Sequence, residues 1–252
     1  MVPSTDTDNK VPHEYEEPAS GVASPLVGEP PVRHLFIDWP SSSIKGTFAI
    51  GAGAPDASPP LYDLPQSDVV ARNAASAVFY SRTSPVHVVV QIQHAKATPT
   101  PPPEGPPAPA ASPAASPTSL RQNTVYVSAR SVRNSVHVQV PQYVGRLPLH
   151  IRCQSTTGNV TVVLPFTFNG MLSWKVDTGT MSMSPGVEER AQRLDARHVK
   201  RHGTAKIGAP PELPPWMTAN GKRGDLCEIS TNTGRLSVCF CGEKAAQGCV
   251  VG

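Results

Sequence analysis

The sequence lacks the motifs of the common enzyme classes. It contains no Gly-x-Ser-x-Gly elbow, no phosphate-binding glycine loop and no His-Glu-x-x-His pair. Its aspartates are scattered and mostly lie beside turns. Asp177, for example, directly precedes a Thr-Gly turn, a position that favours turn chemistry over catalysis. We therefore expect a protein that is not an enzyme, with no catalytic residues and no cofactor.

Long apolar runs and an export signal are also missing. The strongest apolar run, 86–90, has the length of a strand and is far shorter than the ~20 residues of a membrane-spanning helix. The N-terminal MVPSTDTDNK has neither the basic nor the apolar region of a secretory signal. The 22 basic and 19 acidic residues nearly balance, which argues against nucleic acid as a partner. The expected location is intracellular and cytoplasmic.

The cysteines do not have the spacing of a metal site. Their number is five, an odd count without an export signal, which indicates reduced thiols. No paired Cys-x-x-Cys occurs, so no structural zinc is expected. Cys153 and Cys227 flank apolar strand positions and are predicted to be small core residues. Cys239 and Cys241 would share one face of a strand.

Aromatic residues make up 6% and hydrophobic residues 38% of the chain, so the core is expected to be modest and rich in β-branched side chains. The 29 prolines reduce the part of the chain that can fold. We expect a disordered leader at 1–31 and a single β-repeat domain at 32–241. A Pro/Ala-rich disordered insert at 96–119 and a charged loop or short helix at 186–215 would interrupt the domain, and 242–252 would form a flexible tail.

Period-two alternation of apolar residues is the main structural signal. It is clearest at Val160, Val162 and Leu164, directly after Thr157-Gly158. Such alternation buries one face of a strand and leaves the other in water. Similar valine runs surround Val88 and Val138, so we predict an all-β fold.

The alternating segments also repeat. Residues 131–141 align on 155–165 without gaps, which places Asn134 on Gly158. We call this shift of 24 residues (158 minus 134) the repeat offset. The predicted structural turns are at Gly46, Asn134, Gly158, Gly179 and Gly234. Two architectures fit: a β-solenoid-like stack of units in register, which we favour, and an antiparallel β-meander or sandwich in which each Thr-Gly closes a hairpin.

These motifs carry a resemblance. They are the recurring Ser-x-x-Gly-x-Val-x-Val, the Leu-Pro-x-x-Phe-x-Gly that begins at Leu164, and the closing Ser-Thr-x-x-Gly-Arg-Leu-x-Val. Together the motifs resemble a family of uncharacterised fungal proteins, which is itself similar to adhesin-like bacterial domains. The resemblance covers roughly residues 33–241. It implies a β-rich repeat domain of unknown function and supplies no catalytic residues.

One further segment could contact a partner. The charged segment that follows Pro185 has apolar residues at helical spacing, from Val187 to His198, and its arginines could form a basic surface. His87 and His137 occupy matching outward positions and would approach each other if the repeats stack.

The expected function is that of a non-catalytic β-repeat scaffold or interaction protein. An unknown protein partner would bind the Pro-rich insert or the exposed β surface. As an alternative, the chain ends in Cys249-Val250-Val251-Gly252, which has the form of a prenylation box and would make it a peripheral membrane protein. The third alternative is an enzyme of unrecognised type.

Overall fold

A computed structural model describes residues 31–52, 75–94, 124–145, 147–194, 201–208 and 224–243. The expected leader, Pro-rich insert and most of the tail, Cys249 included, lie outside the described residues. The described strands are β1 (His34–Asp38), β2 (Ile44–Ala52), β3 (Ala75–Ser81), β4 (Val86–His94), β5 (Val125–Ser131), β6 (Val136–Gln139), β7 (Leu149–Ser155), β8 (Val160–Leu164), β9 (Gly170–Met183), β10 (Ala191–Arg193), β11 (His202–Ile207) and β12 (Asp225–Phe240), and one helix, α2 (Pro185–Arg190), accompanies them.

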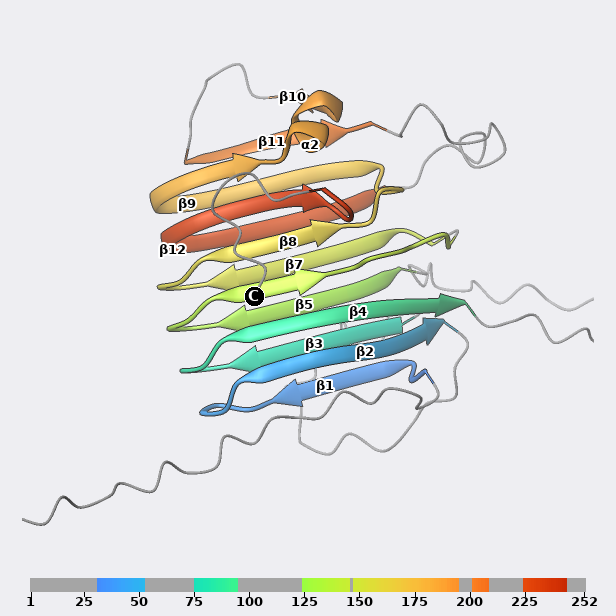
Figure 1. Cartoon of the computed structure of the whole chain (residues 1–252), viewed down its shortest axis with the longest axis vertical. Helices are drawn as coiled ribbons and strands as arrows, with labels where there is room; N and C mark the ends of the chain where they lie inside the picture. Colours follow the sequence, from blue (N-terminus) through green and yellow to red (C-terminus); the bar gives the residue numbers. More distant parts are fainter. Residues whose placement is uncertain are drawn as a thin grey trace, which may run out of the picture.

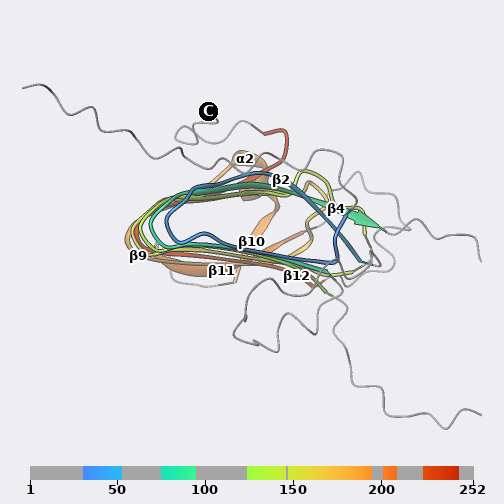
Figure 2. The same cartoon turned by 90° about the horizontal axis from the view of Figure 1, so that it is seen from below.

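All the described strands belong to one sheet that bends over on itself into two facing layers (Figures 1 and 2). The first layer contains β1, β3, β5, β7 and the first half of β12. The second layer contains the second half of β12, followed by β8, β6, β4 and β2. Each unit runs along one layer, turns a corner and returns along the other. Figure 2 shows the corners superimposed at one side of a flattened oval.

The strands within this stack are parallel. Val136 pairs with Val160 and Ser131 with Ser155, which is the repeat offset found in the sequence. Val86 likewise pairs with Val136. The prediction of an all-β fold is confirmed, and the strands form one large, mostly parallel sheet. The antiparallel meander was the wrong alternative, because the Thr-Gly steps join two layers instead of closing hairpins within one.

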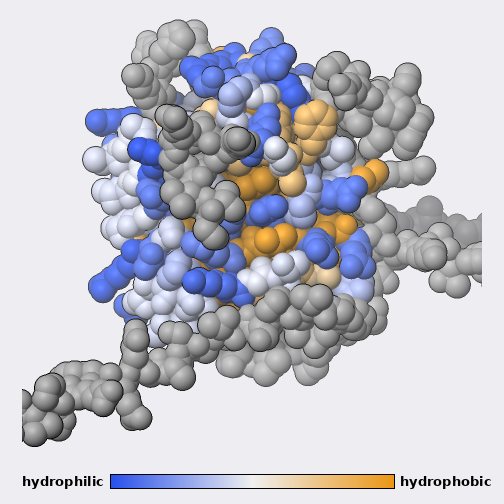
Figure 3. All heavy atoms as spheres, in the orientation of Figure 1, coloured by the Kyte–Doolittle hydropathy of each residue, from blue (hydrophilic) through white to orange (hydrophobic). Residues whose placement is uncertain are grey.

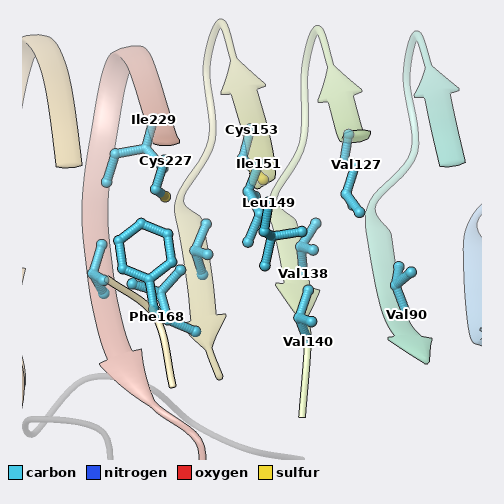
Figure 4. Packing of buried hydrophobic residues seen from close by; sticks show 14 of the residues in the cluster. Val90, Val127, Val138, Val140, Leu149, Ile151, Cys153, Phe168, Cys227 and Ile229 are labelled. Atoms are coloured by element: carbon cyan, nitrogen blue, oxygen red, sulfur yellow. The ribbon is translucent and has the colours of Figure 1, made fainter. Parts of the chain in front are cut away.

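A column of apolar side chains fills the space between the layers (Figure 4). Val138 and Val162 are fully buried, and Val238 is 1% exposed. Because successive side chains of a strand alternate, every second residue of each unit adds to this column. The predicted inward valines therefore form one continuous core, whose fully buried members include Val88, Val127, Ile151 and Leu236.

Buried hydroxyl groups join the corners. The Oγ of Ser131 donates to the carbonyl of Ser84 at 3.0 Å, and the Oγ of Ser155 donates to that of Asn134 at 2.8 Å. In the next unit along the stack, Thr231 Oγ1 donates to the carbonyl of Gly158 at 2.9 Å. These three corners each receive a hydrogen bond from the neighbouring unit through a side chain that is itself buried.

The corners also require small residues. A Cβ on Gly158 would lie 2.3 Å from the carbonyl oxygen of Asn134, and one on Gly234 would lie 2.4 Å from that of Gly158. Gly179 and Gly234 have φ values of 144° and 146°, which favour glycine. Both lie inside long strands that continue through the corner, and Gly46 lies inside β2, so only Asn134 and Gly158 occupy bends between separate strands.

The order of the units in space differs from their order in the chain. β12, the last strand in sequence, lies between β7 and β9 (Figure 1). Asp225 begins β12 and is 1% exposed; its Oδ1 accepts the Leu149 N–H at 2.9 Å, and its Oδ2 accepts the Asn169 N–H at 3.0 Å. One buried carboxylate thus joins the starts of the units on either side of β12.

The C-terminal end of the stack has its own cover. β11 pairs antiparallel with β9, and β10 pairs antiparallel with β11. The segment expected as a charged loop or short helix, 186–215, begins with α2, which ends at Arg190, and Ala191 starts β10. Val187 points into the core and is fully buried, so one turn of helix is enough to cover this part of the apolar column.

Candidate functional surface

The outward side chains of the first layer form a polar and aromatic ladder across β5, β7 and β12. The Tyr126 and His150 rings meet edge to face, with centroids 5.1 Å apart. His150 Nε2 lies 3.1 Å from Glu228 Oε2, and Arg152 Nε lies 4.0 Å from the same oxygen. The parallel register places equivalent side chains about 5 Å apart, so each contacts the next along the stack.

A second rung lies nearer the corners. The guanidinium of Arg130 is 5.8 Å from the centre of the Tyr80 ring. Tyr80 and Arg130 are neighbours in register, as are Arg130 and Gln154. We call the outward residues Tyr80, Tyr126, Arg130, His150, Arg152 and Glu228 the first-layer ladder. It combines a broad, regular surface with side chains that restrain one another.

Sequence reasoning did not find this ladder. The repeat offset relates Tyr126 to His150, so their pairing could have been inferred from the repeat. The contact with Glu228 could not, because β12 pairs with β7 across a long stretch of intervening sequence.

On the second layer, His87 and His137 are neighbours, with ring centroids 5.9 Å apart. His87 Nε2 lies 3.2 Å from Ser135 Oγ. Desolvation by partial burial lowers the pKa of both imidazoles, and the charge of Lys45 adds to the lowering of the His87 pKa. The expected approach of the two histidines is confirmed, and in the parallel register Lys45 precedes them in the same outward row.

The cysteines occupy separate environments. Cys153 and Cys227 are fully buried in the core, as expected, and burial raises the pKa of both thiols. They stay neutral near pH 7 and pack as apolar side chains. Cys239 is buried on the outer side of β12, and Cys241 follows the end of that strand. Within the described residues, no three His, Cys, Asp or Glu side chains gather as a metal site would require.

Arg190, the first arginine of the charged segment that follows Pro185, is held by several contacts. Its Nε donates to the Gly208 carbonyl at 2.9 Å, and its other nitrogens donate to the carbonyls of Phe166 (2.8 Å) and Phe168 (2.7 Å). The guanidinium lies 4.3 Å from the centre of the Phe240 ring. Burial lowers its pKa, an effect that the nearby Glu243 opposes.

Among the described residues of this charged segment, Arg190 is therefore held against the protein and not presented as a free cation. Arg190 fastens α2 to the end of β11 and to the loop before β9, while Arg193 and Arg201 are exposed. The remaining arginine of the segment lies outside the described residues. No helix in the described ranges has the length and apolar character needed to cross a membrane.

Fold and surface together define an all-β protein of stacked parallel strand–corner–strand units with a structured polar exterior. A family model described as a domain of unknown function (DUF7330) matches residues 33–243, most of the 252-residue chain. The chain belongs to this family.

Among solved structures, the chain is similar to one from Clostridium sporogenes ATCC 15579 that is described as a candidate cell adhesion protein. The identity is 8% and the TM-score 0.35, and the match covers 66% of this chain and 56% of the other, little more than half its length. No curated protein matches this sequence.

Proposed function

We propose that this protein is a non-catalytic β-repeat scaffold that binds a protein partner through the first-layer ladder. The observation that carries the proposal is the composition and order of that surface. Tyrosine and arginine are the side chains most enriched in protein interfaces, because they bury a large area and still offer directional hydrogen bonds. Here Tyr80 and Arg130 are neighbours in register. Arg152 and Tyr126, which is 9% exposed, lie on the same outward face.

The ladder is also preorganised. Tyr126 packs on His150, and Glu228 faces both His150 and Arg152, so these side chains already have restricted rotamers in the folded chain. A partner that binds such a surface loses less side-chain entropy than one that must order flexible groups. The mixture of a carboxylate with two arginines favours a partner with charges of both signs.

Charge reversal of the exposed arginines tests this proposal. Arg130→Glu and Arg152→Glu change the ladder without touching the core, since both side chains are exposed. Affinity purification of the full chain from its native cells is expected to recover a partner that both variants lose. Lys45→Glu, an exposed change on the second layer, is the matched control and should keep it.

Two results would assign the function elsewhere. Loss of the partner on deletion of 96–119, with no effect of the arginine variants, would place binding in the Pro-rich insert. Transfer of the protein from membranes to the soluble fraction by Cys249→Ser would support the lipid-anchored alternative. A purified partner that binds wild type and both arginine variants equally would refute the ladder as the interface.

A further inference from the structure

β1 ends the first layer, and the core beneath it is incompletely covered. Its inward residues Leu35 and Ile37 are only half-buried. Their partners in register on β3, Ala77 and Phe79, are fully buried. The apolar column therefore continues to the end of the first layer and there lacks part of its cover from the described residues.

The corresponding end of the second layer is different. Ile44 is fully buried and Phe48 is 4% exposed, although both belong to the outermost strand β2. The edge of β2 is also partly occupied: the Val32 N–H donates to the Ala49 carbonyl at 3.2 Å, and the Gly51 N–H donates to the Val32 carbonyl at 3.0 Å. The incomplete cover is thus specific to β1.

The hydrogen bonds of β1 set the direction of its remaining main-chain groups. The Ser76 N–H donates to the Arg33 carbonyl at 2.9 Å, and the Trp39 N–H donates to the Tyr80 carbonyl at 3.0 Å. In a parallel pair, the residues whose main-chain groups face the neighbour alternate with residues whose groups face away. On β1 the residues whose main-chain groups face away from β3 are His34, Phe36 and Asp38.

We propose that a second copy of this chain pairs with β1 edge to edge, antiparallel, around a twofold axis at Phe36. In this register Phe36 exchanges two N–H···O bonds with its own counterpart. His34 lies opposite Asp38 of the second copy, and Leu35 lies opposite Ile37. Because only His34, Phe36 and Asp38 have main-chain groups that face away from β3, each hydrogen-bonded pair must join two of these residues. A twofold axis at Phe36 pairs all three of them with the second copy.

The side chains of β1 are complementary to themselves in this register. An imidazole faces a carboxylate at each end, an aromatic ring faces its counterpart in the middle, and the half-buried aliphatic residues cover each other. Asp38 Oδ1 is buried and has no hydrogen-bond partner within the described chain. His34 Nδ1 lies 2.8 Å from Ser76 Oγ, so the imidazole and the opposed carboxylate would meet by turning toward each other across the contact. An isologous contact of this kind closes at a dimer. It assigns a partner that the proposed function does not, and it uses no residue of the first-layer ladder.

Sedimentation velocity on the full chain tests the contact. We expect a concentration-dependent equilibrium between the 26.7 kDa monomer and a dimer. Phe36→Pro removes an N–H that faces away from β3, so the variant should fold and weaken the dimer about tenfold or more. Leu194→Lys is the control, because it removes an exposed apolar side chain near the other end of the stack. A wild type that stays monomeric, or a dimer weakened by Leu194→Lys and not by Phe36→Pro, overturns the proposal.

Disulfide trapping tests the register independently of the proline variant. In a chain with Cys241 and Cys249 changed to Ser, Phe36→Cys places two thiols opposite each other at a Cα separation of about 5.5 Å, which a disulfide can span. Asp38→Cys is the matched control, since that residue faces His34 and not itself. Mild oxidation should trap the dimer of the Phe36→Cys chain much faster. Equal trapping of both variants, or of neither, refutes this register.

Discussion

At the corner side of the stack, three successive contacts between units use the same group: a buried Ser or Thr hydroxyl donates to a carbonyl of the neighbouring corner. On the opposite side, where strands begin and end, the joining residues occur once each. Asp225 bridges the starts of β7 and β9, and Arg190 bridges the end of β11 and the loop after β8.

This difference shows how a repeat is built and how it is ended. A repeated hydroxyl sets the spacing of units wherever another unit follows, so it suits a stack of any length. A buried charge that occurs only once instead specifies which strand lies next to which, because a strand in the wrong position would leave that charge buried without hydrogen-bond partners. Polar side chains cover the corner side, at the left in Figure 3, while apolar ones are visible on the middle of the same face.

Removal of the Asp225 carboxylate should have the largest effect. In Asp225→Ala, the buried N–H groups of Leu149 and Asn169 each lose a charged acceptor. We expect a loss of about 4 kcal/mol in the free energy of unfolding, measured by urea denaturation. Asp177→Ala is the control, since that carboxylate is exposed and its ion pair with Lys175 spans 3.9 Å in solvent. Equal losses in the two variants would refute the bridging role.

A methyl group at a corner glycine should cost somewhat less. Gly234→Ala combines a φ of 146° with a Cβ placed 2.4 Å from a backbone oxygen, and we expect a loss of about 3 kcal/mol. Gly224→Ala is matched to it in sequence and type, but a Cβ there would meet nothing within 4 Å. Thermal unfolding of both variants compares them. A Gly234→Ala chain as stable as Gly224→Ala would show that the corner has room.

Loss of one repeated hydroxyl should cost the least of these three changes. Ser155→Ala leaves the Asn134 carbonyl without its donor, for an expected loss of about 1 kcal/mol in urea denaturation. Ser128→Ala, on the outer face of β5, is the control and should stay near wild type. The prediction fails if Ser155→Ala is as harmful as Asp225→Ala, because repeated and singular bonds would then carry equal weight.

The same contrast explains what the sequence could predict. The inward valines, the repeat offset and the neighbourhood of His87 and His137 are local or periodic features, so they could be inferred from one chain. The insertion of β12 beside β7 could not. β12 pairs with strands that lie far from it in the chain, and the pattern near Asp225 does not mark the two distant N–H groups that its carboxylate accepts.

The helix ends at Arg190 for a related reason. Apolar spacing at Val187, Ala191 and Leu194 fits a helix, but β11 offers main-chain partners from Ala191 onward. Tertiary hydrogen bonds then outweigh a weak helical preference. The first-layer ladder was missed because its contacts join different units. The repeat offset could have predicted the pairing of Tyr126 with His150, but not the contact with Glu228.

The last prediction concerns acid, at the row of His87 and His137 beside the corners. Burial first, and then Lys45 for His87 and His87 for His137, lowers the folded-state pKa of both groups below 6.5. As the pH falls, the unfolded chain therefore binds protons before the folded one. The stability from the neutral pair is fully present above about pH 6.5 and is lost as the pH falls through the lowered values. In the variant with both histidines changed to Asn, the free energy of unfolding should fall less between about pH 7.5 and about pH 5 than in the wild type. The control variant His202→Asn, at an exposed position, should show the same fall as the wild type. An unchanged slope in the double variant would show that the two rings titrate as they do in the unfolded chain, and that proximity within the row has no energetic consequence.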